Sequence, residues 1–307
     1  PKLFYPRRTT LPTPLCVILK MRLERKTGMN FFDLHTDTPL KLLQGCAPLQ
    51  TAGFSGSAFG RYAAVRAAWL KGDEPHPLQC CHQLLRAQRL AEQAVQHPRR
   101  KTVYMVENAG FLAKNPARLL TLYRWGVRAL SLTWNGENRL AGGALSSGSL
   151  TPAGQSVLQK AEQLGMAVDL SHLNHQSARA AVKLLHHPLV THACCYAVCP
   201  NPRNLPDDVL LLVAARGGVI GLCLYPPFLG GDPFKMLPLH LNHLLRLGLG
   251  SSVAIGTDFD GAEMHPDLQQ NSNIPALYRH LAALGFKKKL LNAFFYQNAL
   301  AFWGKMC

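Results

Sequence analysis

Short apolar runs alternate along this chain with longer segments in which apolar residues recur at helical spacing. From Met29 onward eight such runs can be distinguished: Asn30–His35, Tyr62–Trp69, Thr102–Glu107, Val127–Thr133, Ala167–His172, Pro188–His192, Gly218–Leu224 and Val253–Asp258. A nearly continuous apolar run indicates a strand buried on both faces, as in a parallel sheet that helices cover. The pattern therefore predicts an α/β protein with a parallel sheet.

The segments between these runs carry the signals that begin and end helices. Thr151 and Pro152 suit the cap and first position of a helix that runs to Leu164, and Gly165 suits its end. Further helices are predicted at Asn174–His187, Asp207–Arg216 and Leu237–Leu247. Eight strand–helix units in one chain favour a (β/α)8 barrel of the TIM type. An open, doubly wound sheet is the alternative, but no glycine-rich phosphate loop follows the first strand.

Histidines and carboxylates are scarce in this chain, yet they recur at the ends of the predicted strands. There are 13 histidines and 17 acidic residues. Five of the predicted strands end in or beside one of them, namely His35 with Asp37, Glu107, His172, His192 and Asp258. His35 and Asp37 stand two residues apart, so on a strand they point to the same side. In a barrel all these ends meet at the face that carries active sites.

Imidazoles and carboxylates together form the nitrogen and oxygen ligand set that suits Zn²⁺ or a similar divalent ion. The six candidate groups are too many for one tetrahedral ion with an open position. Two ions bridged by a carboxylate fit better. Six further histidines fall in helical stretches and are expected to be surface groups rather than ligands: His175, His186, His187, His240, His243 and His280.

Composition indicates a globular protein and argues against a nucleic-acid partner. The 307 residues are 48% hydrophobic with a mean hydropathy of zero, and no apolar run approaches the ~20 residues of a membrane helix. The net charge is 33 − 17 = +16, which could suit a basic protein that binds nucleic acid on a barrel scaffold. The basic residues are scattered, however, and aromatic residues make up only 8%. A solvated basic surface is the preferred interpretation.

The first 28 residues differ in character from the rest. They hold seven Lys or Arg against a single acidic residue, Glu24. The apolar piece Leu15–Leu19 is too short for the ~7–15-residue core of a signal peptide. We expect residues 1–28 to be a disordered basic leader or the product of an upstream start site, with Met29 a plausible first residue. Residues 29–307 are then a single catalytic domain.

Nine cysteines are present, some of them clustered, as in Cys80–Cys81 and Cys194–Cys195. No pair of CxxC motifs has the spacing of a zinc ribbon. A chain of this length does not need disulfides for stability, so reduced thiols and a cytoplasmic location are expected.

Nine segments of the chain carry a family resemblance in the expected order and spacing. They are FDLHTDTP at 32–39, YMVENAG at 104–110, GVRALSLTWN at 126–135, SLTPAG at 149–154, LGMAVDLSH at 164–172, PLVTHA at 188–193, RNLPDD at 203–208, GGVIGL at 217–222 and AIGTDFDG at 254–261. With these the chain resembles the membrane (renal-type) dipeptidases, peptidase family M19. That family consists of zinc peptidases with an amidohydrolase-like barrel.

The resemblance implies a role for each strand-end residue. His35, Asp37 and Glu107 would hold one Zn²⁺, and Glu107, His172 and His192 a second, with Glu107 bridging the two. A hydroxide shared by the ions would attack the carbonyl of a small dipeptide, and Asp258 would carry the proton.

Arg203 would grip the terminal carboxylate of the substrate. The alternative for Arg203 is a pairing with Asp207 or Asp208 at the start of a helix. No membrane anchor is evident, and a homodimer is possible.

The chain departs from the family at one position. Where many members read LTH, this chain has Leu132, Thr133 and Trp134, and an indole cannot take up a proton. Trp134 and Asn135 are then expected to contact substrate. The side-chain amide dipole of Asn135 or Asn138 could replace the polar group that the family's histidine provides. The remaining alternatives are a related binuclear hydrolase that acts on a non-peptide amide or a lactone, and a catalytically impaired homologue.

Overall fold

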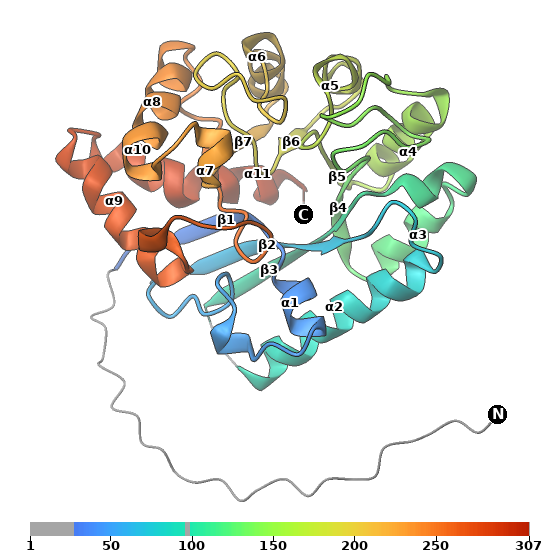
Figure 1. The fold of residues 1–307 in the computed structure, drawn as a ribbon, viewed down its shortest axis with the longest axis horizontal. Coiled ribbons are helices and arrows are strands. Elements are labelled where there is room, and N and C mark those ends of the chain that lie inside the picture. Colours follow the sequence, from blue (N-terminus) through green and yellow to red (C-terminus); the bar gives the residue numbers. More distant parts are fainter. Residues whose placement is uncertain (1–27, 96–98, 307) are drawn as a thin grey trace, which may run out of the picture.

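The computed structural model describes residues 28–95 and 99–306 and contains a closed barrel of eight parallel strands (Figure 1). The strands are β1 (Phe31–Thr36), β2 (Tyr62–Trp69), β3 (Arg100–Glu107), β4 (Val127–Ser131), β5 (Ala167–Asp169), β6 (Pro188–Val190), β7 (Val219–Cys223) and β8 (Val253–Gly256). Each strand pairs with the next along the chain, and β8 pairs with β1. The predicted (β/α)8 barrel is confirmed, and the open doubly wound sheet is wrong.

Helices surround the strands (Figure 1). They are α1 (Thr38–Leu43), α2 (Pro77–Ala94), α3 (Arg118–Arg124), α4 (Pro152–Gln163), α5 (His175–Val182), α6 (Asp207–Ala215), α7 (Pro226–Leu229), α8 (Pro233–Arg246), α9 (Ile274–Ala283), α10 (Lys288–Asn292) and α11 (Asn298–Met306). A π-helical stretch, Ala293–Gln297, leads into α11, and short 3-10 turns lie at Pro48–Gln50, Gly110–Lys114, Pro266–Leu268 and Asn271–Asn273.

The predicted helices are present, but three of them have different bounds. The Thr151 side chain accepts a hydrogen bond from the Gly154 amide and so caps α4 as expected. The helix predicted to reach His187 ends at Val182. The helix predicted from Leu237 begins four residues earlier, at Pro233, because the Asp232 carboxylate caps it through the Phe234 amide. The helix predicted over Asp207–Arg216 ends one residue earlier, at Ala215.

Two apolar clusters stabilise the barrel. One lies between the strands and the surrounding helices. The other fills the barrel interior with side chains such as Phe32, Leu34 and Met105, against which Phe302 and Trp303 of α11 pack. Helix α11 therefore closes one end of the barrel, in agreement with its place in Figure 1. The other end is left for the candidate site.

A bulge in β1 prepares this site. Asp33 lies opposite Ala64 of β2, but Thr36 lies opposite Arg66, so the register slips by one residue between them. Leu34 faces the barrel interior, and in a regular strand its neighbour His35 would face the helices. A bulge re-aims side chains, and here it lets His35 point into the barrel as well.

Among the described residues no helix is long and apolar enough to cross a membrane. The leader predicted at 1–28 falls outside the described residues except for Gly28, and it stays a prediction. All seven described cysteines are free thiols.

Candidate metal centre

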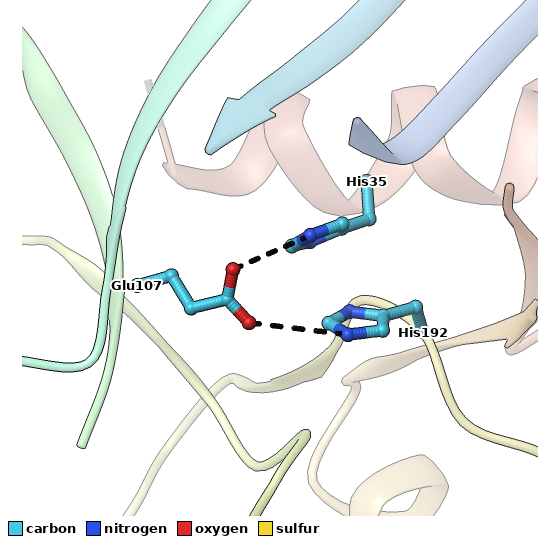
Figure 2. A group of neighbouring side chains, drawn as sticks. All are labelled: His35, Glu107 and His192. Atoms are coloured by element: carbon cyan, nitrogen blue, oxygen red, sulfur yellow. Dashed lines mark ion pairs between the residues drawn. The ribbon is translucent and has the colours of Figure 1, made fainter. Parts of the chain in front are cut away.

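Four side chains from four parts of the barrel meet at its open end. Glu107 ends β3, and Figure 2 shows its carboxylate facing the rings of His35 and His192 from one side, with one oxygen toward each ring. The His35 Nε2 atom lies 3.6 Å from one Glu107 oxygen, and the His192 Nε2 atom lies 4.0 Å from the other. His172 Nε2 is 2.6 Å from that second oxygen. One carboxylate therefore faces three imidazoles, all of them buried.

Two further carboxylates approach the centre from the side of His35. Asp37 Oδ2 and Asp258 Oδ1 lie 3.3 and 4.0 Å from His35 Nε2. Burial alone would lower the pKa of His35, but the charges of Glu107, Asp37 and Asp258 together outweigh it and raise that pKa to about 10. Three buried carboxylates at one place therefore favour the binding of a cation there.

The other two imidazoles are held neutral. Burial lowers the pKa of both His172 and His192 well below the usual value, and the nearby cations Arg203 and His35 lower it further. The Nδ1 atom of His172 lies 2.8 Å from the Asn135 amide oxygen. Because that oxygen can only accept, Nδ1 carries the proton and Nε2 keeps its lone pair. The two Nε2 atoms of His172 and His192 face each other at 2.9 Å.

These residues fit a divalent metal. His35 Nε2 and Asp37 Oδ1 are buried and make no hydrogen bond within the described part of the chain, which is costly unless another partner satisfies them. Two overlapping groups have ligand atoms close enough to share an ion: His35, Glu107 and His192, and His35, Asp37 and Asp258. Bare imidazole nitrogens beside carboxylates are the donors that Zn²⁺ prefers.

The backbone is strained where it presents these groups. Only four non-glycine residues in the described ranges have a positive φ, and three of them lie at or beside the site: Asn108 at 67°, His172 at 70° and Asp258 at 67°. This left-handed conformation is unfavourable for residues with a Cβ and collects at functional sites. Each of these residues follows a strand end. The side chains of His172 and Asp258 lie at the centre, whereas the Asn108 side-chain amide donates to the Leu70 carbonyl.

A cavity of about 710 Å³ opens above the centre. Its polar floor includes Asp37, Glu107, His172, His192 and Asp258, and its walls are largely aromatic and aliphatic. On one wall the rings of Trp69 and Trp134 meet edge to face, with centroids 5.7 Å apart. The predicted contact of Trp134 with substrate is compatible with this position, since 43% of its surface is exposed.

Arg203 lies in the same cavity and does not pair with a helix carboxylate. Its Nη2 donates to the His192 carbonyl oxygen, and its guanidinium stacks over the Phe228 ring at 4.9 Å. Asp208 is bound instead by Arg179, and Asp207 by His243. The buried Nε of Arg203 has no hydrogen-bond acceptor among the described residues. The alternative pairing considered from the sequence is therefore wrong, and Arg203 keeps donors free.

Three sequence-based expectations need correction or refinement. His240 is fully buried rather than a surface group: its Nδ1 accepts from the Cys195 amide and its Nε2 donates to the Leu229 carbonyl. Asn138 does not line the cavity, because its amide binds the Leu132 carbonyl and the Leu140 amide. Asn135 does line it, but its oxygen is engaged by His172.

Sequence reasoning missed two buried aspartates that lie behind the site, Asp33 on β1 and Asp169 on β5. Asp33 binds Thr257, next to Asp258, and Asp169 binds Thr191, next to His192. The signal was available: a carboxylate in the middle of an apolar strand is rarely left without partners.

The fold and the centre together define a metal-dependent hydrolase of the barrel type. A family model described as membrane dipeptidase, peptidase family M19, matches residues 68–306. The chain belongs to this family, and the metal-dependent dipeptidase class predicted from the sequence is confirmed at that level.

Similar proteins agree with this assignment. An uncharacterised protein encoded in the pqqA 5′ region of Klebsiella pneumoniae is 31% identical over 211 residues, which cover 64% of this chain and 78% of that protein. An uncharacterised dipeptidase of Schizosaccharomyces pombe is 31% identical over 209 residues, covering 64% of this chain and 51% of the yeast protein. The chain thus spans about half of the latter relative.

Among solved structures, a metallo peptidase from Rhodobacter sphaeroides superposes with a TM-score of 0.82 at 20% identity. The match covers 91% of this chain and all of that one. That protein was crystallised with a phosphinate mimic of the dipeptide L-Ala-D-Ala. At this level of identity the likeness supports the fold.

Proposed function

We propose that this protein hydrolyses dipeptides at a centre that holds two Zn²⁺ ions. The observation that carries the proposal is the position of Glu107, whose two carboxylate oxygens face His35 on one side and His172 with His192 on the other. A carboxylate in that position is suited to bridge two ions. His35 and Asp37 would complete the first ligand set, and His172 and His192 the second.

Zinc ions at such a centre supply Lewis-acid polarisation of a carbonyl and lower the pKa of a water molecule. The protein supplies the proton carrier. Asp258 lies at the centre, and burial raises its pKa to about 6. A carboxyl group with a pKa near neutrality can accept a proton and return it to a leaving amine. Asp258 is therefore proposed as the general acid–base group.

The same cavity contains a group suited to one end of a dipeptide. Arg203 is buried, always charged and partly unpaired, and a guanidinium fork binds a carboxylate through two parallel hydrogen bonds. A carboxylate held there fixes the distance from the C-terminus to the reacting carbonyl, so short substrates are selected by geometry. The dipeptide mimic bound by the Rhodobacter sphaeroides peptidase is consistent with this substrate class.

The family and the cavity favour a peptide over the non-peptide amide or lactone considered from the sequence. Among the described residues that line the cavity, Arg203 offers a cation for a carboxylate, and Glu263 offers a carboxylate outside the proposed metal centre for an ammonium group, which matches the two charged ends of a free dipeptide. A homodimer and a cytoplasmic location stay predictions, and so does the leader.

The test separates metal binding from chemistry. Asp258→Asn should retain the metal content of the wild-type protein and lose about 10²–10⁴-fold in dipeptide turnover. His172→Ala should lose metal. Turnover of a panel of dipeptides, including some with a D-residue at the C-terminal position, is the readout. Activity confined to lactones or non-peptide amides would overturn the proposed substrate class, and unchanged turnover by Asp258→Asn would overturn the assigned role.

A further inference from the structure

At two places behind the centre, a buried aspartate on one strand binds both the amide and the hydroxyl of a threonine that follows another strand. We call each such pair a clamp. In one, Asp169 of β5 accepts the Thr191 amide at 2.8 Å and the Thr191 hydroxyl at 2.5 Å. In the other, Asp33 of β1 accepts the Thr257 amide at 2.9 Å and the Thr257 hydroxyl at 2.6 Å. Each threonine directly precedes a residue of the site, His192 or Asp258.

The clamps differ in what the threonine oxygen meets next. The Thr191 oxygen lies 2.8 Å from His192 Nδ1 and 3.3 Å from His35 Nδ1, with the Ser171 hydroxyl also at 3.3 Å. Within the described part of the chain, the hydrogen bonds of the Thr257 oxygen other than that to Asp33 are to backbone groups, namely the His35 carbonyl and the Phe259 amide. Only the first clamp reaches an imidazole ring.

The direction of the hydrogen bonds follows from the aspartate. Asp169 Oδ1 accepts two backbone amides, those of Ser171 and Thr191, which identifies the carboxylate as an acceptor. The hydroxyl proton of Thr191 is therefore given to Asp169 Oδ2. Its oxygen can then only accept, so the ring nitrogens that face it must carry their protons.

We propose that Thr191, oriented by Asp169, is a positioning residue that sets the tautomer of both His192 and His35. With Nδ1 protonated on each ring, the Nε2 atom of His192 directs its lone pair to the centre beside Glu107, and the Nε2 atom of His35 does so once a metal ion takes the place of its proton. One hydroxyl thereby orients one ligand from each of the two proposed metal positions. Partners behind metal-bound histidines act in this way and tune affinity. The inference rests on the proposed metal centre.

The backbone of Thr191 is tightly packed, as a residue that positions other side chains requires. A Cβ added at Gly221 of β7 or at Gly256 of β8 would collide with the Thr191 carbonyl oxygen. The backbones of β7 and β8 therefore lie against the Thr191 carbonyl, and they leave this residue little freedom to move.

The chain offers matched variants for a test. Thr191→Val removes the hydroxyl with little change of shape, Thr191→Ser restores it, and Thr257→Val opens the equivalent clamp that touches no ring. The first measurement is Zn²⁺ affinity by competition with a chromophoric chelator. We expect Thr191→Val to lose about 10- to 100-fold, and Thr191→Ser and Thr257→Val to stay within about threefold of wild type.

The second measurement is the nitrogen NMR spectrum of the histidine rings in metal-free protein, which distinguishes a protonated from a bare ring nitrogen. The His192 signals should show a protonated Nδ1 in the wild type, in Thr191→Ser and in Thr257→Val, and a changed pattern in Thr191→Val. Equal metal affinity for wild type and Thr191→Val would overturn the proposal. So would equal losses in Thr191→Val and Thr257→Val, since these would indicate a merely structural clamp.

Failure of this inference is distinguishable from failure of the proposed function. A wild-type protein that binds no Zn²⁺ contradicts the metal centre, while the ring-nitrogen spectrum still decides whether Thr191 sets the tautomer. A wild-type protein that binds Zn²⁺ and a Thr191→Val variant that binds it equally well contradict only the positioning role.

Discussion

Asp260 joins the loop after β8 to the segment that follows β1, and its removal should destabilise the protein markedly. One carboxylate oxygen accepts the Ala52 amide at 2.7 Å. The other accepts the Gly53 amide at 3.1 Å and the Thr38 hydroxyl at 2.6 Å. Thr38 directly follows Asp37 of the candidate centre. The contact therefore stabilises the fold and also supports a proposed ligand.

The expected size follows from these three bonds. A hydrogen bond to a charged acceptor contributes about 1.5–3 kcal/mol, and the three share one partly buried carboxylate, so we expect about 3–5 kcal/mol for Asp260→Gly. Glycine is the informative replacement because Asp260 has a φ of 70°, which glycine adopts without strain. Asp260→Asn keeps one acceptor oxygen and should lose about 2 kcal/mol.

Urea denaturation followed by circular dichroism measures these losses, provided that the slope of each transition is unchanged. Asp73→Asn is the control, because Asp73 is exposed and a surface change of this kind stays within about 0.5 kcal/mol. A loss below about 1 kcal/mol for Asp260→Gly, or a larger loss for Asp260→Asn than for Asp260→Gly, would refute the reasoning.

Three further predictions concern single groups. Arg203→Lys should lower kcat/KM for dipeptides by about 10- to 100-fold through the loss of paired hydrogen bonds to the substrate carboxylate, and an unchanged value would contradict its role. Burial lowers the pKa of His240, whose Nδ1 must stay bare to accept from Cys195. The stability contributed by neutral His240 is therefore present above about pH 6.5 and lost as the pH falls, and urea titrations should show a weaker acid dependence for His240→Asn. Burial raises the pKa of Cys81 to about 12, so this thiol stays protonated at about pH 8 and reacts slowly. Iodoacetamide at that pH should therefore label the exposed Cys46 before Cys81, and peptide mass spectrometry measures the order of labelling.

The barrel could be predicted because its signals are local. Apolar runs bounded by helix caps specify strand and helix in turn, and the rare polar residues at the run ends mark one face. The observed strands are shorter than predicted at β5, β6 and β8, since His172, His192 and Asp258 lie two or three residues beyond the last strand residue. Where a strand ends depends on its hydrogen bonds to strands that are distant in sequence. The residue pattern of one apolar run does not reveal these partners.

The ligand candidates could be predicted, but the groups that orient them could not. His35 lies inward only because β1 slips against β2, and a bulge of this kind has no signature in the local sequence. Thr191 was overlooked because threonine is ordinary in a strand, and only its position opposite Asp169 gives it a role. His240 was assigned to the surface from its helical context, whereas the cap at Asp232 and the packing of α8 bury it.

Metal dependence of dipeptide turnover tests the central claim most directly. Protein freed of metal by a chelator would be titrated with Zn²⁺, with bound metal and dipeptide hydrolysis measured on the same samples. The account predicts that the metal-free protein is inactive and that activity returns as Zn²⁺ binds, reaching its maximum when both proposed positions around Glu107 are filled. Full activity in protein without bound metal would contradict it.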